Sequence, residues 1–138
     1  MYPRQACRVL FICPDNAIRS QLAAAWLYRL TAGQIEARTA GADPKEIPMA
    51  VQQRVAQLRR KPVSLIPTSL RQTAGTSFDY IITLCNKQCE QLPVHPYDDE
   101  GVIWDFPAPG TLEQMRQMEF ELMERLLLWL EVTGLRAA

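Results

Sequence analysis

Cys13, Arg19 and Ser20 have the residue types and the spacing of a nucleophilic site for a small oxyanion. Cys13 ends an apolar run, five residues separate it from Arg19, and Ser20 follows directly. A thiolate at the base of such a loop can attack a tetrahedral oxyanion, while backbone N–H groups and the guanidinium hold the oxygens of the anion. A helix that begins near Ser20 adds the partial positive charge of its N-terminus on the same side. The pattern therefore favours chemistry on a phosphate-like group.

Each residue type in this loop has a physical reason. A free thiol titrates at about 8.5, so a helix N-terminus and a nearby guanidinium are expected to stabilise the thiolate of Cys13. Asn16 tolerates the positive φ of a tight anion-binding turn, and Ser20 is expected to cap the helix and donate a hydrogen bond to the sulfur. The alternative is a small buried cysteine before an ordinary loop. The predicted substrate-binding residues are Pro14, Asp15, Asn16, Ala17, Ile18, Arg19 and Ser20.

Alternating strands and helices are expected to position this loop. The sequence predicts strands over residues 8–13, 35–39, 80–84 and 102–104, and helices over 20–30, from Pro48 onward, near 69–73 and over 111–135. Such alternation is typical of a parallel sheet covered on both faces, in which ligands bind beyond the carboxyl ends of the strands. We therefore expect one domain over residues 1–138, with a three-layer α/β/α fold, a four-stranded parallel sheet and helices on both faces.

A second cysteine is predicted at the same edge of the sheet. The strand over residues 80–84 leads into Cys85, and Cys89 follows four residues later. A helical turn there would place the two thiols on one face, near bridging distance, which favours a redox pair over two unrelated loop cysteines. No metal site is indicated, because His95 is the only histidine and there is no second cysteine pair. Cys7 is interpreted as an incidental thiol.

Composition limits the possible partners and the setting. The 138 residues carry 15 basic and 15 acidic side chains, which gives no support for a nucleic acid or an anionic membrane as partner. Four cysteines do not make a disulfide-rich scaffold, and neither a leader segment nor a membrane span is visible. A reducing cytoplasm is the expected setting, in which any disulfide would be transient.

Residues 9–22 resemble the active-site loop of the low-molecular-weight protein tyrosine phosphatase family, which includes the thioredoxin-coupled arsenate reductases. The family pattern of Cys, two residues, Asn, two residues, Arg and Ser or Thr falls on Cys13, Asn16, Arg19 and Ser20. The resemblance continues through residues 37–41, 67–70, 78–85 and 104–109, and the later segments favour the arsenate-reductase branch. It implies the same α/β fold, with Cys85 as the second cysteine of a redox sequence.

The chain departs from the family pattern at two positions. The family has an Asp directly before a Pro as general acid, where this chain has Ala108 before Pro109. Asp105 is the candidate replacement, and the alternative is that it is an ordinary loop carboxylate. The usual third cysteine also precedes a proline, where this chain has Leu92, so Cys89 is a displaced candidate for the resolving thiol.

Three functions follow from these residues and the resemblance. The first is an arsenate reductase-like enzyme with Cys13, Arg19, Cys85, Cys89 and Asp105 as catalytic residues, no bound cofactor, and thioredoxin or a small thiol as reductant. The second is a phosphatase acting on phosphotyrosine through a cysteinyl phosphate. The third is an oxyanion-binding module with little or no turnover. We expect a monomer or a weak homodimer. Leu127, Leu128 and Leu130 widen the apolar face of the last helix, which is compatible with a dimer contact, although packing in the core is the preferred interpretation.

Overall fold

Four parallel strands form one sheet in the order β2-β1-β3-β4. The computed structural model describes residues 7–91 and 101–135 of the chain. In chain order the elements are β1 (Arg8–Cys13), α1 (Arg19–Thr31), β2 (Glu36–Gly41), α2 (Met49–Arg59), the 3-10 helix η1 (Leu70–Thr73), β3 (Tyr80–Cys85), β4 (Gly101–Asp105) and α3 (Leu112–Thr133). Every predicted strand and helix is present, with bounds that differ by a few residues.

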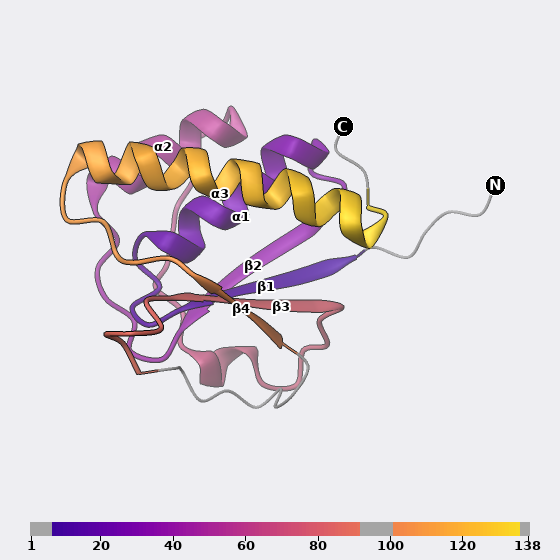
Figure 1. Ribbon diagram of the computed structural model, residues 1–138, viewed down its shortest axis with the longest axis horizontal. Helices are drawn as coiled ribbons and strands as arrows, with labels where there is room; N and C mark the ends of the chain where they lie inside the picture. Colours follow the sequence, from indigo (N-terminus) through magenta and orange to yellow (C-terminus); the bar gives the residue numbers. More distant parts are fainter. Residues whose placement is uncertain (1–6, 92–100, 136–138) are drawn as a thin grey trace.

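The two faces of the sheet carry layers of different thickness. Helices α1, α2 and α3 lie together on one face, and η1 with its flanking loops lies on the other (Figure 1). The predicted four-stranded parallel sheet with helices on both faces is thus confirmed, although the second layer contains only a single-turn helix. The main core lies on the side of the three α-helices, and a smaller cluster around Leu70 lies on the side of η1.

Strand β1 is central because its side chains are apolar on both faces. Val9, Phe11 and Cys13 belong to the core under the α-helices, whereas Leu10 and Ile12 belong to the smaller cluster. All five are fully buried, as a central strand of a parallel sheet requires. Phe11 pairs with Ile82 of β3 and Thr39 of β2 across the parallel ladder. This register brings the end of β1 level with the ends of its neighbours.

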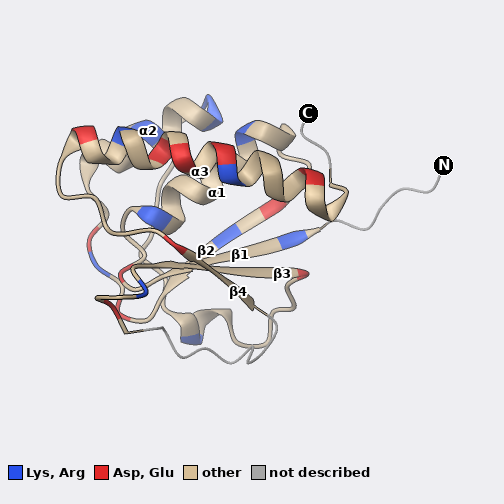
Figure 2. Cartoon of the chain, viewed as in Figure 1, with Lys and Arg blue, Asp and Glu red and all other residues tan. Residues whose placement is uncertain are grey.

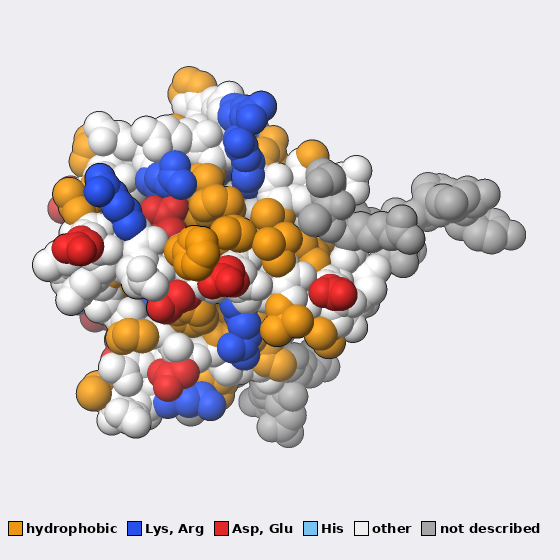
Figure 3. Space-filling view, turned by 45° about the horizontal axis from the view of Figure 1, so that its top comes forward, with side chains coloured by type: hydrophobic (Ala, Val, Ile, Leu, Met, Phe, Trp, Pro, Cys, Tyr) orange, Lys and Arg blue, Asp and Glu red, His pale blue; other side chains and the backbone are white. Residues whose placement is uncertain are grey.

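The inner stripe of α3 anchors that helix over the sheet. Met115, Met118, Leu122, Leu126 and Leu130 are buried, and Trp129 beside them is half-buried. Of the three leucines expected to widen the apolar face, Leu130 packs in the core one turn beyond Leu126, which confirms core packing for this residue. Leu127 and Leu128 are exposed, and Figure 3 shows apolar side chains among charged ones on the helical face of the molecule.

Charged residues are scattered over the elements with both signs interspersed (Figure 2). Arg54 of α2, for example, forms an ion pair with Glu119 of α3, with 2.8 Å between Nε and Oε1. Glu119 is almost fully buried and also accepts a hydrogen bond from Trp26 Nε1 at 3.0 Å, so this carboxylate joins three helices. No helix among the described residues is long and apolar enough to cross a membrane.

Replacing Leu126 by alanine should destabilise the fold far more than the same change at Leu128. Leu126 is fully buried between α3 and the sheet, so Leu126→Ala is expected to lower the free energy of unfolding by about 2–5 kcal/mol. Leu128 is exposed, and Leu128→Ala should change it by less than about 0.5 kcal/mol. Urea titrations followed by circular dichroism measure both values. Equal losses would contradict the placement of α3.

Candidate active site

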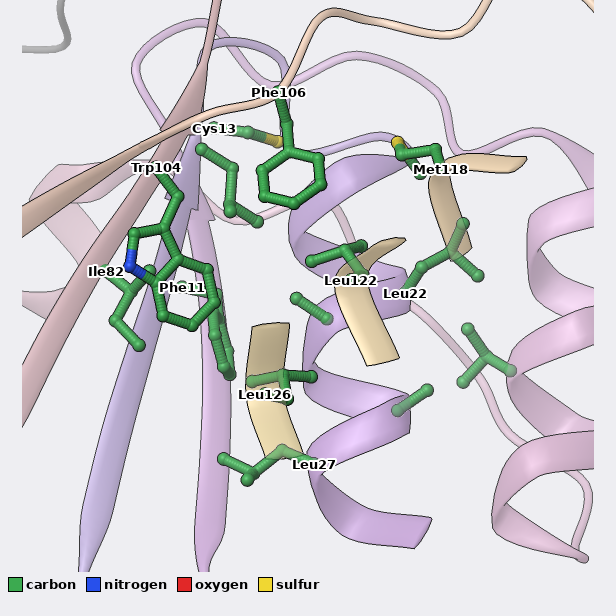
Figure 4. Close-up of a cluster of buried hydrophobic side chains, with 14 of the residues drawn as sticks. Phe11, Cys13, Leu22, Leu27, Ile82, Trp104, Phe106, Met118, Leu122 and Leu126 are labelled. Atoms are coloured by element: carbon green, nitrogen blue, oxygen red, sulfur yellow. The ribbon is translucent and has the colours of Figure 1, made fainter. Parts of the chain in front are cut away.

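The loop between β1 and α1 forms the candidate site at the carboxyl edge of the sheet. Cys13 is the last residue of β1, and Arg19 is the first residue of α1. Asn16 has a φ of 55°, which confirms the left-handed turn predicted for this residue. Figure 4 shows Cys13 at the end of the core with the ring of Phe106 close to it. The strand, the turn and the helix thus hold the nucleophile candidate and the arginine on one side of the sheet.

The sulfur of Cys13 has two polar neighbours within its own loop. Its Sγ lies 3.1 Å from Ser20 Oγ and 3.5 Å from Asp15 Oδ1. Asn16 Nδ2 donates to the same Ser20 oxygen at 2.9 Å. The predicted contact of Ser20 with the sulfur is confirmed. The predicted helix cap is wrong, because Ser20 lies inside the first turn of α1 and its hydroxyl faces Cys13, while the capping position falls on Ile18.

The protonated form of Cys13 is favoured in this arrangement. Burial raises the pKa of the Cys13 thiol above its ordinary value, and the charge of Asp15 raises it further. Hydrogen bonds from Ser20 and the charge of Arg19 act in the opposite direction but do not outweigh the burial. The prediction of a stabilised thiolate is therefore wrong for this conformation, because it counted the positive charges and not the loss of water around the sulfur.

Arg19 is buried, and protein acceptors hold its guanidinium. Nη1 and Nη2 donate to the two carboxylate oxygens of Glu90, with Nη2 2.9 Å from Oε2, and Nη1 also donates to the backbone oxygen of Phe106 at 3.0 Å. Burial disfavours the charged guanidinium, yet the hydrogen bond to Glu90 raises the pKa of Arg19 above its ordinary value. The same bond lowers the pKa of Glu90. The pair is therefore fully ionised at neutral pH.

Sequence reasoning missed Glu90. It lies in the turn after β3, where Cys89 N and Glu90 N both donate to the backbone oxygen of Asn86, at 3.2 and 2.9 Å. The only signal in the sequence was an acidic residue next to Cys89, at the edge of the sheet where the arginine was expected. No periodic pattern in residues 86–90 indicates which way this side chain points.

Cys85 lies at the predicted edge of the sheet but on a different face from Cys13. Ile12 pairs with Thr83, so Leu84 is level with Cys13, and Cys85 comes one residue later. Successive side chains of a strand alternate between faces, which places the two sulfurs on opposite sides of the sheet plane. Burial, and next the charge of Glu90, raise the pKa of the Cys85 thiol.

The segment after β3 does not form the helix that would place Cys85 and Cys89 on one face. It makes a single turn over residues 87–89, with Cys85 buried and Cys89 exposed. Both thiols are free. Their pairing as a disulfide stays a prediction.

The carboxylate that contacts Cys13 is Asp15 and not Asp105. Asp105 is exposed at the end of β4, where it pairs with Cys85 and its Oδ1 accepts a hydrogen bond from Lys87 N at 3.1 Å. Asp15 Oδ1 lies inside the loop and also accepts a hydrogen bond from Ala17 N at 3.0 Å. Ala108 is exposed and carries no ionisable group. Asp105, the candidate acid, thus lies beside Cys85. Leu92 and His95 lie outside the described residues.

The chain belongs to the low molecular weight phosphotyrosine protein phosphatase family, because the model of this family matches residues 8–104. The members it resembles are enzymes. An arsenate reductase of Halalkalibacterium halodurans is 25% identical over 122 residues, which span 86% of this chain and 85% of that protein.

Two solved arsenate reductases have the same fold. The enzyme of Archaeoglobus fulgidus superposes with a TM-score of 0.72 at 25% identity, over 86% of this chain and 94% of that one. A thioredoxin-dependent arsenate reductase of Corynebacterium glutamicum gives a TM-score of 0.64 at 26% identity, over 93% of this chain and 63% of that one. The resemblance inferred from Cys13, Asn16, Arg19 and Ser20 is thereby confirmed at the level of the family.

Two substitutions in the loop should shift the pKa of Cys13 in opposite directions. Asp15→Asn removes a negative charge 3.5 Å from the sulfur and should lower the pKa, so alkylation by iodoacetamide at pH 7 becomes faster. Ser20→Ala removes the hydrogen-bonding hydroxyl and should raise the pKa, so alkylation becomes slower. The measurement is the pH profile of alkylation of the tryptic peptide over residues 9–19. Shifts of the same sign in both variants would contradict the assignment of these contacts.

Proposed function

We propose that the protein reduces arsenate to arsenite, with Cys13 as the nucleophile and Cys85 as the second thiol. The observation that carries this proposal is the pair of cysteines at the ends of adjacent parallel strands, beside a loop with a buried arginine. A hydrolytic phosphatase needs one thiol at this edge. A reductase needs a second one, because two electrons must pass from thiols to arsenic.

In the first step Cys13 attacks the arsenic of bound arsenate. A sulfur–arsenic bond forms, and one hydroxyl group of arsenate takes up the thiol proton and leaves as water. Arg19 and the backbone N–H groups of residues 15–20 would hold the remaining oxygens. Because burial raises the pKa of Cys13, its proton must leave the sulfur as the sulfur–arsenic bond forms, and the arsenate hydroxyl that departs as water would accept it.

In the second step the Cys85 sulfur attacks the Cys13 sulfur. A disulfide forms, the sulfur–arsenic bond breaks, and its electron pair stays on arsenic, which leaves as arsenite. Because the two side chains alternate to opposite faces, this step requires the chain after Leu84 to rearrange. Cys89 is exposed nearby and can then exchange with the Cys13–Cys85 disulfide, which frees Cys13 and leaves a Cys85–Cys89 disulfide.

The reductant that reopens the last disulfide is proposed to be thioredoxin or a small thiol. The Corynebacterium glutamicum relative is a thioredoxin-dependent arsenate reductase, and another structural neighbour is an arsenate reductase in a phosphate-binding state. These neighbours support an oxyanion in the loop and a dithiol as electron donor. Exposed Cys89 is the sulfur that such a donor would reach first.

The family match supports a phosphatase as the second candidate. Hydrolysis of a phosphate monoester needs an acid to protonate the leaving oxygen, and such help is worth about 10²–10⁴-fold in rate. Asp15 is the only carboxylate in contact with Cys13 among the described residues, and it is partly exposed. Arsenate loses water in the comparable step, so the missing acid at Ala108 is less costly for the reductase than for the phosphatase.

The proposal predicts that arsenite production depends on Cys85. With thioredoxin, thioredoxin reductase and NADPH, the wild-type protein should consume NADPH when arsenate is added, and Cys85→Ser should reduce steady-state turnover at least about 100-fold because the second thiol is lost. Arsenite is measured directly by chromatography coupled to arsenic detection. Cys7→Ser is the matched control, because Cys7 precedes β1 at the opposite end of the strand from Cys13.

The three candidate functions give different results in the same assays. Unchanged arsenite production in Cys85→Ser contradicts the reductase. Hydrolysis of p-nitrophenyl phosphate that is abolished by Cys13→Ser, without arsenite production, identifies a phosphatase. Binding of phosphate with neither activity identifies an oxyanion-binding module.

A further inference from the structure

Glu90 has no role in the reaction described above, yet it makes a two-pronged contact with the arginine of the loop. We propose that Glu90 is a positioning residue that turns the guanidinium of Arg19 so that one edge faces the bound oxyanion. The inference rests on the proposed function, since it assumes that Arg19 binds an oxyanion. It adds a residue outside the loop to the determinants of anion affinity.

Counting the donors of Arg19 shows which edge is free. A guanidinium has five N–H groups. Both hydrogens of Nη1 are used, one by Glu90 Oε1 and one by the backbone oxygen of Phe106 at 3.0 Å, and one hydrogen of Nη2 is used by Glu90 Oε2 at 2.9 Å. The Nε–H and the second Nη2–H have no acceptor in residues 7–91 and 101–135.

The two unused donors lie on the same edge of the guanidinium plane. Nη2 is the terminal nitrogen on the side of the Nε–H, whereas Nη1 is on the side of Cδ. This edge is a two-donor fork of the kind that binds two oxygens of a phosphate-like group. Glu90 therefore occupies the end of the guanidinium and leaves its side available for a ligand.

Glu90 is itself held in place. Its Oε1 accepts a hydrogen bond from Asn86 N at 2.7 Å in addition to the bond from Arg19, and its side chain is only 25% exposed. A carboxylate with a backbone donor and a two-pronged arginine contact has little freedom to turn. Because the carboxylate is fixed and planar, it also fixes the plane of the guanidinium.

The alternative is that Glu90 competes with the oxyanion for Arg19. A competitor would occupy the edge that the ligand needs, and its removal would tighten ligand binding. The free Nε edge favours the positioning role, in which removal of the carboxylate leaves a buried guanidinium without its orienting partner and weakens ligand binding. The two roles thus predict opposite signs for the same substitution.

The test compares Glu90→Gln with wild type, using inorganic phosphate as the probe. Isothermal titration calorimetry should show binding that is about tenfold weaker or more in Glu90→Gln. Glu131→Gln is the matched control, since Glu131 is exposed near the far end of α3 from the site (Figure 1), and it should bind phosphate like wild type. Thermal unfolding of both variants checks that each is folded at the titration temperature.

Nitrogen-15 NMR of the arginine side chain separates positioning from a general structural effect. In wild type, hindered rotation should give separate signals for the Nη hydrogens of Arg19, and phosphate should shift the Nε–H signal while the Nη1 signals stay in place. In Glu90→Gln the Nη signals should merge as the guanidinium rotates.

The outcomes distinguish failure of the inference from failure of the proposed function. Equal or tighter phosphate binding in Glu90→Gln, or a phosphate effect on the Nη1 signals instead of Nε–H, overturns the positioning role and leaves an oxyanion site in place. No phosphate binding by wild type at millimolar concentration overturns both, even if the Nη signals confirm the contact with Glu90.

Discussion

The buried positive charge of Arg19 is the constraint on which the site depends. A guanidinium removed from water is costly unless acceptors satisfy it, and no acceptor for it comes from its own loop. The carboxylate of Glu90 comes from the turn after β3, and the backbone oxygen of Phe106 comes from the chain after β4. The bonds that keep Arg19 ionised therefore connect the segments that follow β1, β3 and β4 at one edge of the sheet. The buried charge of Arg19 thus both holds this edge together and provides the donors for an oxyanion.

A second set of contacts fixes the other half of the loop through Asn16. Its Oδ1 accepts a hydrogen bond from Thr68 N at 2.9 Å, and its Nδ2 donates to Ser20, so one side chain links the chain before η1 to the partner of the sulfur. Gly41 permits this approach, because a Cβ there would lie 2.7 Å from Asn16 N. The end of β2 must thus be glycine for the loop to hold its shape. Because Asn16 Nδ2 donates to Ser20 Oγ, the position of the Asn16 side chain also orients Ser20 toward Cys13.

The sequence predicts the fold and the loop better than it predicts the surroundings of the loop. Unbroken apolar runs identify β1 and β3, and a spacing of five residues identifies Cys13 and Arg19, because both signals are local. Glu90 could not be found in this way, since its role depends on a tertiary contact 71 residues away in the chain. Of the two roles predicted for Ser20, the contact with the sulfur is found and the helix cap is not, because α1 begins at Arg19, one residue before Ser20. Burial of Cys13, which reverses the expected direction of its pKa, is also a property of the assembled sheet edge.

The placement of Glu90 links the binding part of the site to its redox part. Glu90 follows Cys89 directly, and the turn that carries both begins immediately after Cys85. Under the proposed reaction, Cys85 reaches the face of Cys13 only if the chain after Leu84 moves, and that movement displaces the carboxylate that orients Arg19. Cys85, Cys89 and Glu90 belong to one short segment, so the proposed rearrangement for disulfide formation would act on the contacts of Cys85 and of Arg19 together.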